Sequence, residues 1–247
     1  MSNSPAKLRL DVALVERELA DSRQKAQALI LAGKVLVDGQ KSDKPGRAVT
    51  AENRIAVELP LRYVSRGGIK LEAALQHFNL SVARRVCLDV GTSTGGFTDC
   101  LLQHGALRVH AIDTGAGQID WKLRTDDRVI LHEHTNARYL TFEQIGELAG
   151  VIVCDVSFIS VTLLIPALVP LVAPGGDWIV LVKPQFEVGR DLVGKGGIVR
   201  DPVLQHSACL KVASALEGFG LATALTESPI LGAEGNREFL LHARSKS

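Results

Sequence analysis

An apolar strand, a glycine-rich turn and the beginning of a helix follow one another within residues 86–102, which read V-C-L-D-V-G-T-S-T-G-G-F-T-D-C-L-L. Gly91, Gly95 and Gly96 carry no Cβ, so the main chain of the turn can approach a ligand closely. The N–H groups that begin the following helix lack intrahelical partners and favour a negatively charged group. The stretch therefore predicts an α/β fold with a nucleotide-type ligand at this turn.

From residue 66 onward, apolar segments of strand length alternate with amphipathic segments of helix length. The pattern predicts a helix at 69–78 and strands at 86–90, 107–112, 128–132, 150–154, 178–182, 224–230 and 238–244. Apolar strands separated by such helices form a mostly parallel sheet covered on both faces. We therefore expect residues 66–247 to form a Rossmann-like α/β domain, joined by a linker at 61–65 to a separate domain at 1–60.

The N-terminal segment reads as a small α+β domain. A short helix is followed by a second helix that Asp21 or Ser22 caps and that Gly33 ends. A strand with an Asp38-Gly39 turn comes next, and R-I-A-V-E-L is a further short strand.

The charge of the chain is distributed unevenly. The net charge is only +1, so the whole chain does not indicate a nucleic-acid partner. Residues 1–72, however, hold 13 lysine and arginine residues against 9 aspartate and glutamate residues, which leaves the remainder net acidic. The basic side of the chain is therefore its N-terminal segment.

The cysteines and the apolar segments indicate a cytoplasmic protein. Cys87, Cys100, Cys154 and Cys209 form no C-x-x-C pair and have no histidine at metal-ligand spacing, so we expect buried free thiols and no metal site. The N-terminus is polar and then charged, unlike a signal peptide. The best membrane candidate, Val161–Pro174, is too short to span a bilayer and contains three prolines.

The glycine spacing G-x-x-x-G-G differs from the dinucleotide fingerprint G-x-G-x-x-G and favours S-adenosylmethionine (SAM) as the ligand. Asp113 ends the second predicted strand of the larger domain, where a carboxylate can accept hydrogen bonds from ribose hydroxyls. Asn136 follows the third strand and is expected near an adenine ring. The predicted cofactor residues are Asp89, Gly91, Thr92, Ser93, Gly95, Gly96, Phe97, Asp113, Thr114, Asn136 and Asp155.

Four charged residues far apart in sequence are expected at the same edge of the sheet. Asp155 ends the fourth strand and Lys183 ends the fifth. Lys70 lies at the start of a helix that should run antiparallel to the first strand, which places it at the carboxyl ends of the strands. Glu238 joins them if the last strand is antiparallel.

Two lysines beside two carboxylates suit methylation of a ribose 2′-hydroxyl, which must lose a proton as it attacks a methyl group. A lysine can act as the base only if its pKa is lowered, as a second ammonium and partial burial favour. We expect Lys183 to be the base, Lys70 its positioning partner, and Asp155 and Glu238 the groups that orient the amines. The alternative is two structural salt bridges. An amino-methyltransferase is disfavoured, because D-V-S-F stands where such enzymes have N-P-P-Y or D-P-P-Y.

Two resemblances agree with this interpretation. The text L-x-x-A-L-V-x-R-x-L-A-x-S-R-x-x-A-x-x-L-I-x-A-G-K-V-x-V-D-G resembles the S4-type RNA-binding domain. The Lys-Asp-Lys-Glu set, together with S-R-G-G-x-K-L and G-x-S-T-G-G-F-T, resembles FtsJ-type ribose 2′-O-methyltransferases. With L-V-K-P-Q-F-E-V-G and D-V-S-F-I-S, the chain resembles the TlyA family over nearly its whole length.

The TlyA resemblance implies a SAM-dependent methyltransferase fold with a seven-stranded sheet whose last strand is antiparallel. It also implies 2′-O-methylation of a cytidine in 16S or 23S ribosomal RNA, on free RNA or on ribosomal subunits. The predicted RNA-binding residues are Arg9, Arg17, Arg23, Lys25, Lys34, Arg47 and Arg66. Two alternatives stay open: a non-catalytic RNA-binding or ribosome-assembly factor, and a haemolysin acting on membranes, a name that the family also carries. Membrane insertion is not expected, because the chain shows no spanning or strongly amphipathic segment.

Overall fold

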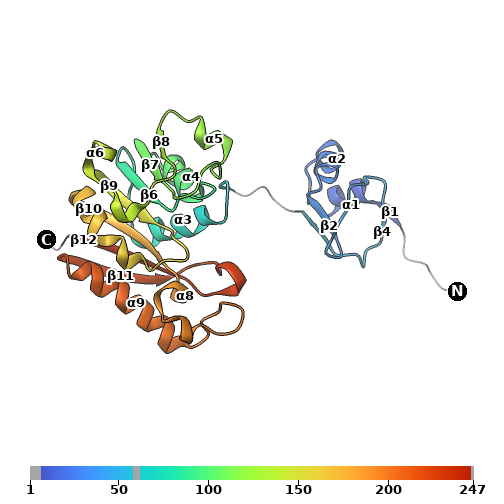
Figure 1. The fold of residues 1–247 in the computed structure, drawn as a ribbon. Coiled ribbons are helices and arrows are strands. Elements are labelled where there is room, and N and C mark those ends of the chain that lie inside the picture. Colours follow the sequence, from blue (N-terminus) through green and yellow to red (C-terminus); the bar gives the residue numbers. More distant parts are fainter. Residues whose placement is uncertain (1–6, 58–61, 246–247) are drawn as a thin grey trace. The chain divides into compact units, whose positions relative to one another are not determined.

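In the computed structural model, which describes residues 7–57 and 62–245, the chain divides into two units, Met1–Pro60 and Leu61–Ser247 (Figure 1). Each unit has its own hydrophobic core. Within the stretch predicted as a linker, residue 61 lies outside the described residues, and Tyr63 is buried in the core of the larger unit.

The smaller unit packs two helices against short strands. Its helices are α1 (Leu10–Glu16) and α2 (Arg23–Leu31), and its strands are β1 (Leu8–Arg9), β2 (Val35–Val37), β3 (Gln40–Lys41), β4 (Ala48–Val49) and β5 (Ile55–Val57). Of the two caps predicted for α2, Asp21 and Ser22, the Ser22 side chain is the one that caps the helix. Asp38 and Gly39 both have positive φ, 53° and 80°, which a two-residue hairpin between β2 and β3 requires. The two-residue strands β1 and β4 are too short to leave a periodic signal, and the sequence reasoning missed them.

The larger unit is built on a seven-stranded sheet with the order β11-β12-β10-β9-β6-β7-β8. The strands are β6 (Val86–Val90), β7 (Arg108–Ile112), β8 (Val129–His132), β9 (Ala149–Cys154), β10 (Val172–Val182), β11 (Leu221–Glu227) and β12 (Phe239–Ser245). Strand β12 is antiparallel to both neighbours, whereas β10, β9, β6, β7 and β8 are parallel. The predicted methyltransferase-type sheet, with its last strand antiparallel, is confirmed.

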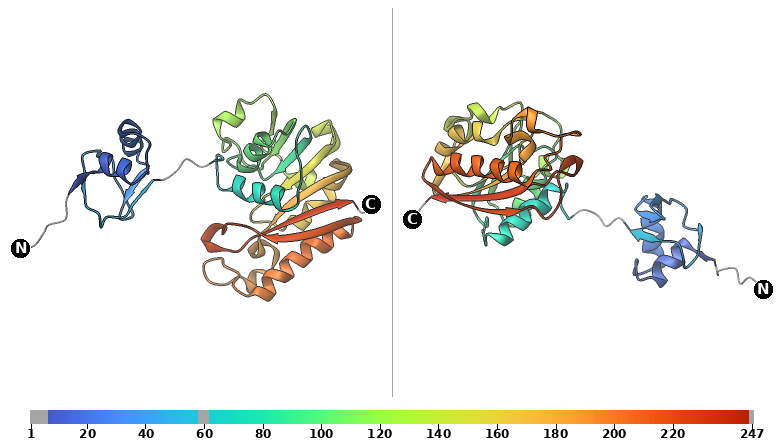
Figure 2. Two further views of the ribbon diagram at one scale, coloured as in Figure 1. Left: turned by 180° about the vertical axis from the view of Figure 1, so that it is seen from behind. Right: turned by 90° about the horizontal axis from the view of Figure 1, so that it is seen from below.

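Helices cover both faces of this sheet (Figure 2). The α-helices are α3 (Gly67–His77), α4 (Gly96–Gln103), α5 (Trp121–Arg124), α6 (Phe142–Ile145), α7 (Ile165–Leu168), α8 (Pro184–Glu187) and α9 (Pro202–Glu217). Short 3₁₀ turns are η1 (Ala137–Tyr139), η2 (Val161–Leu163), η3 (Val169–Leu171), η4 (Arg190–Leu192) and η5 (Ala233–Gly235). Alternate residues of each strand face opposite layers: Val151 and Val153 pack with α3 and α4, and Ile152 and Cys154 pack with α7 and α9.

The apolar segment 161–174 is broken into η2, α7, η3 and the start of β10. Among the described residues, no helix is long and apolar enough to cross a membrane. All four cysteines are buried free thiols, as expected.

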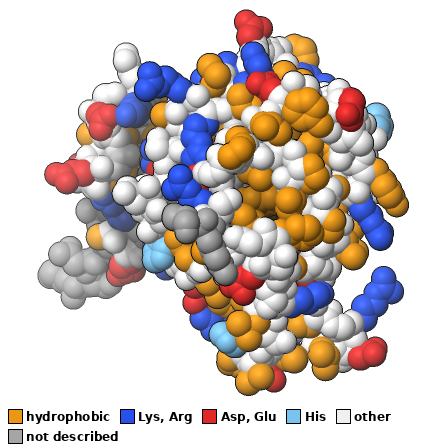
Figure 3. All heavy atoms as spheres, turned by 90° about the vertical axis from the view of Figure 1, so that its left-hand side faces the viewer, with side chains coloured by type: hydrophobic (Ala, Val, Ile, Leu, Met, Phe, Trp, Pro, Cys, Tyr) orange, Lys and Arg blue, Asp and Glu red, His pale blue; other side chains and the backbone are white. Residues whose placement is uncertain are grey.

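Figure 3 shows the face that lies on the left in Figure 1, and hydrophobic side chains gather over part of it. More than half of a folded protein's surface is typically apolar, so this patch does not by itself indicate a partner.

Candidate active site

Two adjoining cavities open where the parallel strands of the larger unit end. One has a volume of about 250 Å³ and the other of about 480 Å³, within or near the range typical of small-molecule sites. Gly91, Ser93, Asp155 and Ser157 line both cavities, so the two form one continuous site. Lys70 and Lys183 line the smaller cavity, whereas Asp113 lines the larger.

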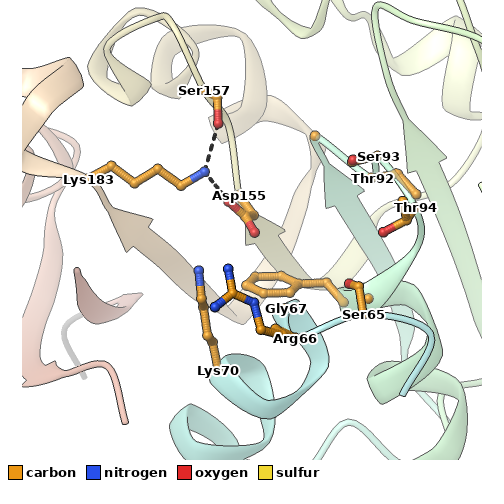
Figure 4. Close-up of a pocket in the computed structure, with 13 residues that line it drawn as sticks. Ser65, Arg66, Gly67, Lys70, Thr92, Ser93, Thr94, Asp155, Ser157 and Lys183 are labelled. Atoms are coloured by element: carbon orange, nitrogen blue, oxygen red, sulfur yellow. Dashed lines mark hydrogen bonds and ion pairs between the residues drawn. The ribbon is translucent and has the colours of Figure 1, made fainter. Parts of the chain in front are cut away.

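Lys183 is held by the loop that follows β9. Its Nζ lies 2.6 Å from Oδ1 of Asp155 in an ion pair, although the approach is not aligned for a hydrogen bond. The same Nζ donates a hydrogen bond of 2.8 Å to Oγ of Ser157 (Figure 4). The Lys183 side chain is only 11% exposed, and it lines the smaller cavity.

Lys70 forms the second lysine–carboxylate pair. Its Nζ lies 2.5 Å from Oε2 of Glu238, which directly precedes β12. Main chain at Gly232 packs against this carboxylate so closely that a Cβ there would lie 2.1 Å from Glu238 Oε1. Glu238 lies behind Lys70 and does not itself line either cavity. The structure thus gathers the four predicted charged residues into two pairs, Lys183–Asp155 and Lys70–Glu238.

The glycines of the turn 91–96 are required by the protein's own packing, a second reason beside the close approach to a ligand that the sequence predicts. A Cβ on Gly91 (φ 86°) would lie 2.4 Å from the carbonyl oxygen of Asp155. A Cβ on Gly95 (φ 94°) would lie 2.3 Å from Leu123, and one on Gly96 would lie 2.2 Å from Oγ of Ser65. The three glycines therefore allow the turn to lie in close contact with the loop after β9, with α5 and with the segment before α3.

Asp89 is completely buried beneath the turn. Its Oδ2 accepts a hydrogen bond of 2.6 Å from the Thr98 hydroxyl, while Oδ1 has no hydrogen-bond partner among the described residues. Burial raises the pKa of Asp89 to about 7, against the opposing effect of the Thr98 hydrogen bond. Asp89 therefore supports the turn from below and lines neither cavity.

Asp113 fixes the other side of the turn. Its Oδ2 accepts from the N–H of Ser93 at 2.8 Å, and its Oδ1 accepts from the N–H of Gly115 at 2.7 Å. A carboxylate has about four acceptor positions, so these bonds leave capacity for a ligand hydroxyl. Asp113 therefore both shapes the cavity and remains a candidate ribose acceptor.

The remaining predicted cofactor residues divide between the cavities. Thr92 and Phe97 line the smaller one, and Thr114 and Asn136 line the larger one. The Asn136 Oδ1 caps η1 by accepting from the N–H of Arg138, which orients the side chain. Sequence reasoning did not assign several lining residues to the site, because polar and apolar side chains of this kind give no pattern; they are Ser65, Gly67, Val90, Thr94, Ile112, Gln118, Thr135, Ala137, Val156, Ser157, Phe158, Ile159 and Leu164.

Three of the basic residues predicted to bind RNA are engaged within the smaller unit. The Arg17 guanidinium donates to the carbonyl oxygens of Asn53 and Thr50, at 2.7 and 2.8 Å. Arg9 and Arg23 both bind the buried carboxylate of Asp11, and each remains about half exposed.

The other four predicted residues differ in their surroundings. Lys25 pairs with Asp21 one helical turn away. Lys34 is exposed and has no hydrogen-bond or ion-pair partner within residues 7–57 or 62–245, whereas Arg47 is half-buried and near enough to Asp38 for a weak electrostatic interaction. Arg66 belongs to the larger unit, where it lines the smaller cavity beside Lys70 (Figure 4).

Comparisons with known proteins show the family to which the chain belongs. The family model described as FtsJ-like methyltransferase matches residues 63–245, and the model of the S4 domain matches residues 8–55. The 16S/23S rRNA (cytidine-2'-O)-methyltransferase TlyA of Mycobacterium tuberculosis is 46% identical over 242 residues, which cover 97% of this chain and 90% of the relative. The chain belongs to the TlyA family of FtsJ-like methyltransferases. It is therefore a methyltransferase with an N-terminal S4 domain.

Two further relatives also cover nearly the whole chain, and a more distant structure shares the fold of the larger unit. Hemolysin A of Brachyspira hyodysenteriae is 44% identical and aligns with 95% of this chain and 99% of its own length. A solved structure from Streptococcus thermophilus has a TM-score of 0.74 at 42% identity and covers 99% of this chain and 90% of that one. An O-methyltransferase of Bacillus cereus, solved with SAH, has a TM-score of 0.53 at 19% identity and shows that the fold is shared.

Proposed function

We propose that this TlyA-family member transfers a methyl group from SAM to the 2′-hydroxyl of a cytidine ribose in 16S or 23S ribosomal RNA, in the cytoplasm. The observation that carries the proposal is the convergence of two lysine–carboxylate pairs on the cavity beside the glycine turn. The RNA substrate is supported by the S4 domain and by the name of the Mycobacterium tuberculosis relative.

The larger cavity fits the adenosine part of SAM. It combines a carboxylate, Asp113, and an amide, Asn136, with apolar walls that include Ile112, Ala137 and Leu164. Polar groups at the ends of an apolar slot suit a ribose and a planar base. When bound there, SAM would supply an electrophilic methyl group. Because Gly91, Ser93 and Asp155 also line the smaller cavity, that methyl group would be presented toward the two lysines.

The smaller cavity is the place for the acceptor ribose. We assign Lys183 in its amine form as the acceptor of the 2′-hydroxyl proton, with Asp155 and Ser157 fixing the position of its Nζ. Lys70 would orient the ribose and its phosphate, and Glu238 would hold Lys70 in place. Arg66 at the cavity rim is suited to a phosphate oxygen.

Replacement of Lys183 tests the assignment. Lys183→Ala is expected to reduce methyl transfer from labelled SAM to ribosomal RNA at least about 100-fold, the typical contribution of a general base, and to leave cofactor affinity nearly unchanged. Lys122→Ala is the matched control, because Lys122 also pairs with a carboxylate, Asp99, and lies outside both cavities. Unchanged turnover in Lys183→Ala would remove this lysine from the reaction.

A further inference from the structure

Loop 155–161, which connects β9 to η2, lines both cavities and is held in an unfavourable conformation. Asp155 and Ser157 line the smaller cavity, and Phe158 lines the larger. Phe158 has a φ of 66°, and its side chain is 91% exposed. Such a conformation is unfavourable for a bulky non-glycine residue and persists only where surrounding contacts impose it. The contacts that hold this loop therefore determine where Asp155 and Ser157 lie.

The first half of the loop is bound by the beginning of α8. Lys183, the N-cap of this helix, contacts Asp155 at 2.6 Å and Ser157 at 2.8 Å. The ring of Phe186, within α8, lies against the ring of Phe158 with a centroid separation of 5.2 Å. These contacts hold the loop at Asp155, Ser157 and Phe158, while Val161 at its far end is buried in the core.

The far end of the loop is bound by the last residue of the same helix. Glu187 Oε2 accepts a hydrogen bond of 2.5 Å from the Ser160 hydroxyl, and Oε1 accepts one of 2.8 Å from the Val161 N–H. The Glu187 side chain is only 3% exposed. A buried carboxylate is tolerated when donors compensate its charge, and Lys211 of α9 supplies a third partner at 3.3 Å.

We propose that Glu187 is a positioning residue for methyl transfer, because it anchors loop 155–161 so that Asp155 and Ser157 meet Lys183. Lys183 and Glu187 lie four residues apart, so a single turn of helix contacts both ends of the loop. Glu187 lines neither cavity and acts only through the loop. The proposal rests on the function proposed above.

Two substitutions at position 187 separate anchoring from general stability. Glu187→Ala removes both loop contacts, and we expect kcat for RNA methylation to fall about 10- to 100-fold, as for other supporting residues of active sites, while KM for RNA changes less than about 3-fold. Glu187→Gln can still accept from the Val161 N–H and donate to Ser160, so it should restore kcat to within about 3-fold of the wild type. The rates are normalised to the folded fraction at the assay temperature.

Lys211→Met is the matched control, since it removes both contacts of α9 with Glu187, the ion pair and the hydrogen bond from Lys211 Nζ to the Glu187 carbonyl oxygen, and leaves both contacts with the loop. We expect wild-type kcat for this variant. If Lys211→Met is as impaired as Glu187→Ala, or if Glu187→Ala keeps wild-type kcat, the proposal is overturned.

Hydrogen exchange of the loop amides provides a measurement that does not depend on activity. We expect Glu187→Ala to accelerate exchange in residues 155–161 and to leave β6 unchanged. Unchanged exchange in the loop would also overturn the proposal. If the wild-type protein does not methylate RNA, the proposed function fails, and the exchange experiment still decides whether Glu187 anchors the loop.

Discussion

The Nζ of Lys70 lies 2.5 Å from Oε2 of Glu238, 168 residues farther along the chain. The two side chains are only 10% and 2% exposed. The pair forms because the first turn of α3 lies at the edge where the parallel strands end, and because β12, being antiparallel, begins at that edge. One contact therefore ties the topology of the sheet to the proposed site.

Loss of one partner of this pair should destabilise the larger unit. Glu238→Gln leaves the Lys70 ammonium buried beside a neutral group, and removal of one partner of a buried pair typically costs about 3–5 kcal/mol in the free energy of unfolding. The control is Glu227→Gln, which breaks an exposed pair with Arg237 and should cost at most about 1 kcal/mol. Urea unfolding of both variants measures the difference; equal stabilities would show that the buried pair has no special role.

The glycine turn allows a test that separates backbone strain from steric clash. Gly91→Ala and Gly117→Ala both place an alanine at positive φ, 86° and 71°. A Cβ at position 117 meets nothing within 4 Å, whereas one at position 91 meets the Asp155 carbonyl. Gly117→Ala should therefore cost only about 1–2 kcal/mol of strain. Gly91→Ala should in addition weaken binding of S-adenosylhomocysteine at least about 10-fold in calorimetry, and equal affinities for the two variants would contradict this account.

The raised pKa of Asp89 predicts that the free energy of unfolding depends on pH. Burial raises its pKa to about 7 from 3.8, so between these values the folded chain binds more protons than the unfolded chain. The contribution of Asp89 to the free energy of unfolding is therefore full below about pH 4, falls as pH rises, and is lost above about pH 7. Asp89→Asn removes this contribution and can keep the Thr98 hydrogen bond. Urea unfolding at pH 5 and pH 8 should show a smaller pH difference for the variant than for the wild type, and an identical difference would be contrary to this prediction.

The basic residues of the S4 domain should differ in their effect on RNA binding. The logarithm of the RNA-binding constant falls linearly with the logarithm of the salt concentration, and loss of one side chain that binds a phosphate makes this slope less steep by about 1. Lys34→Ala and Arg47→Ala should therefore each weaken RNA binding and make its salt dependence less steep. Arg17→Ala should instead lower the melting temperature, because Arg17 holds the carbonyl oxygens of Thr50 and Asn53. Salt titrations and thermal melts separate the two effects. An unchanged salt slope for both Lys34→Ala and Arg47→Ala would remove them from the RNA surface.

The sequence contains enough information to predict the sheet and the four charged residues at its edge. Strand positions follow from apolar runs, and the edge follows from the rule that parallel strands end together. Lys70 and Glu238 can then be placed by the direction of the elements that carry them. This reasoning needs no side-chain detail, which explains why it succeeds over such long sequence separations.

Contacts that depend on side-chain packing could not be predicted in this way. Nothing in the pattern of residues 155–187 shows that Glu187 binds Ser160, or that Ser157 binds Lys183. Gly91 was predicted from contact with a ligand, and the contact of this position with the Asp155 carbonyl could not be predicted from the pattern. A glycine requirement has the same appearance in sequence whether a ligand or the protein itself fills the space.

The position of the transferred methyl group tests the central claim most directly. Ribosomal RNA is incubated with the protein and SAM labelled in its methyl group, and the RNA is digested to nucleosides and separated by chromatography. We expect the label in 2′-O-methylcytidine for the wild type, and at least about 100-fold less label in the same time for Lys183→Ala. Label on a base, or equal labelling by Lys183→Ala, would contradict a ribose methyltransferase that uses this lysine.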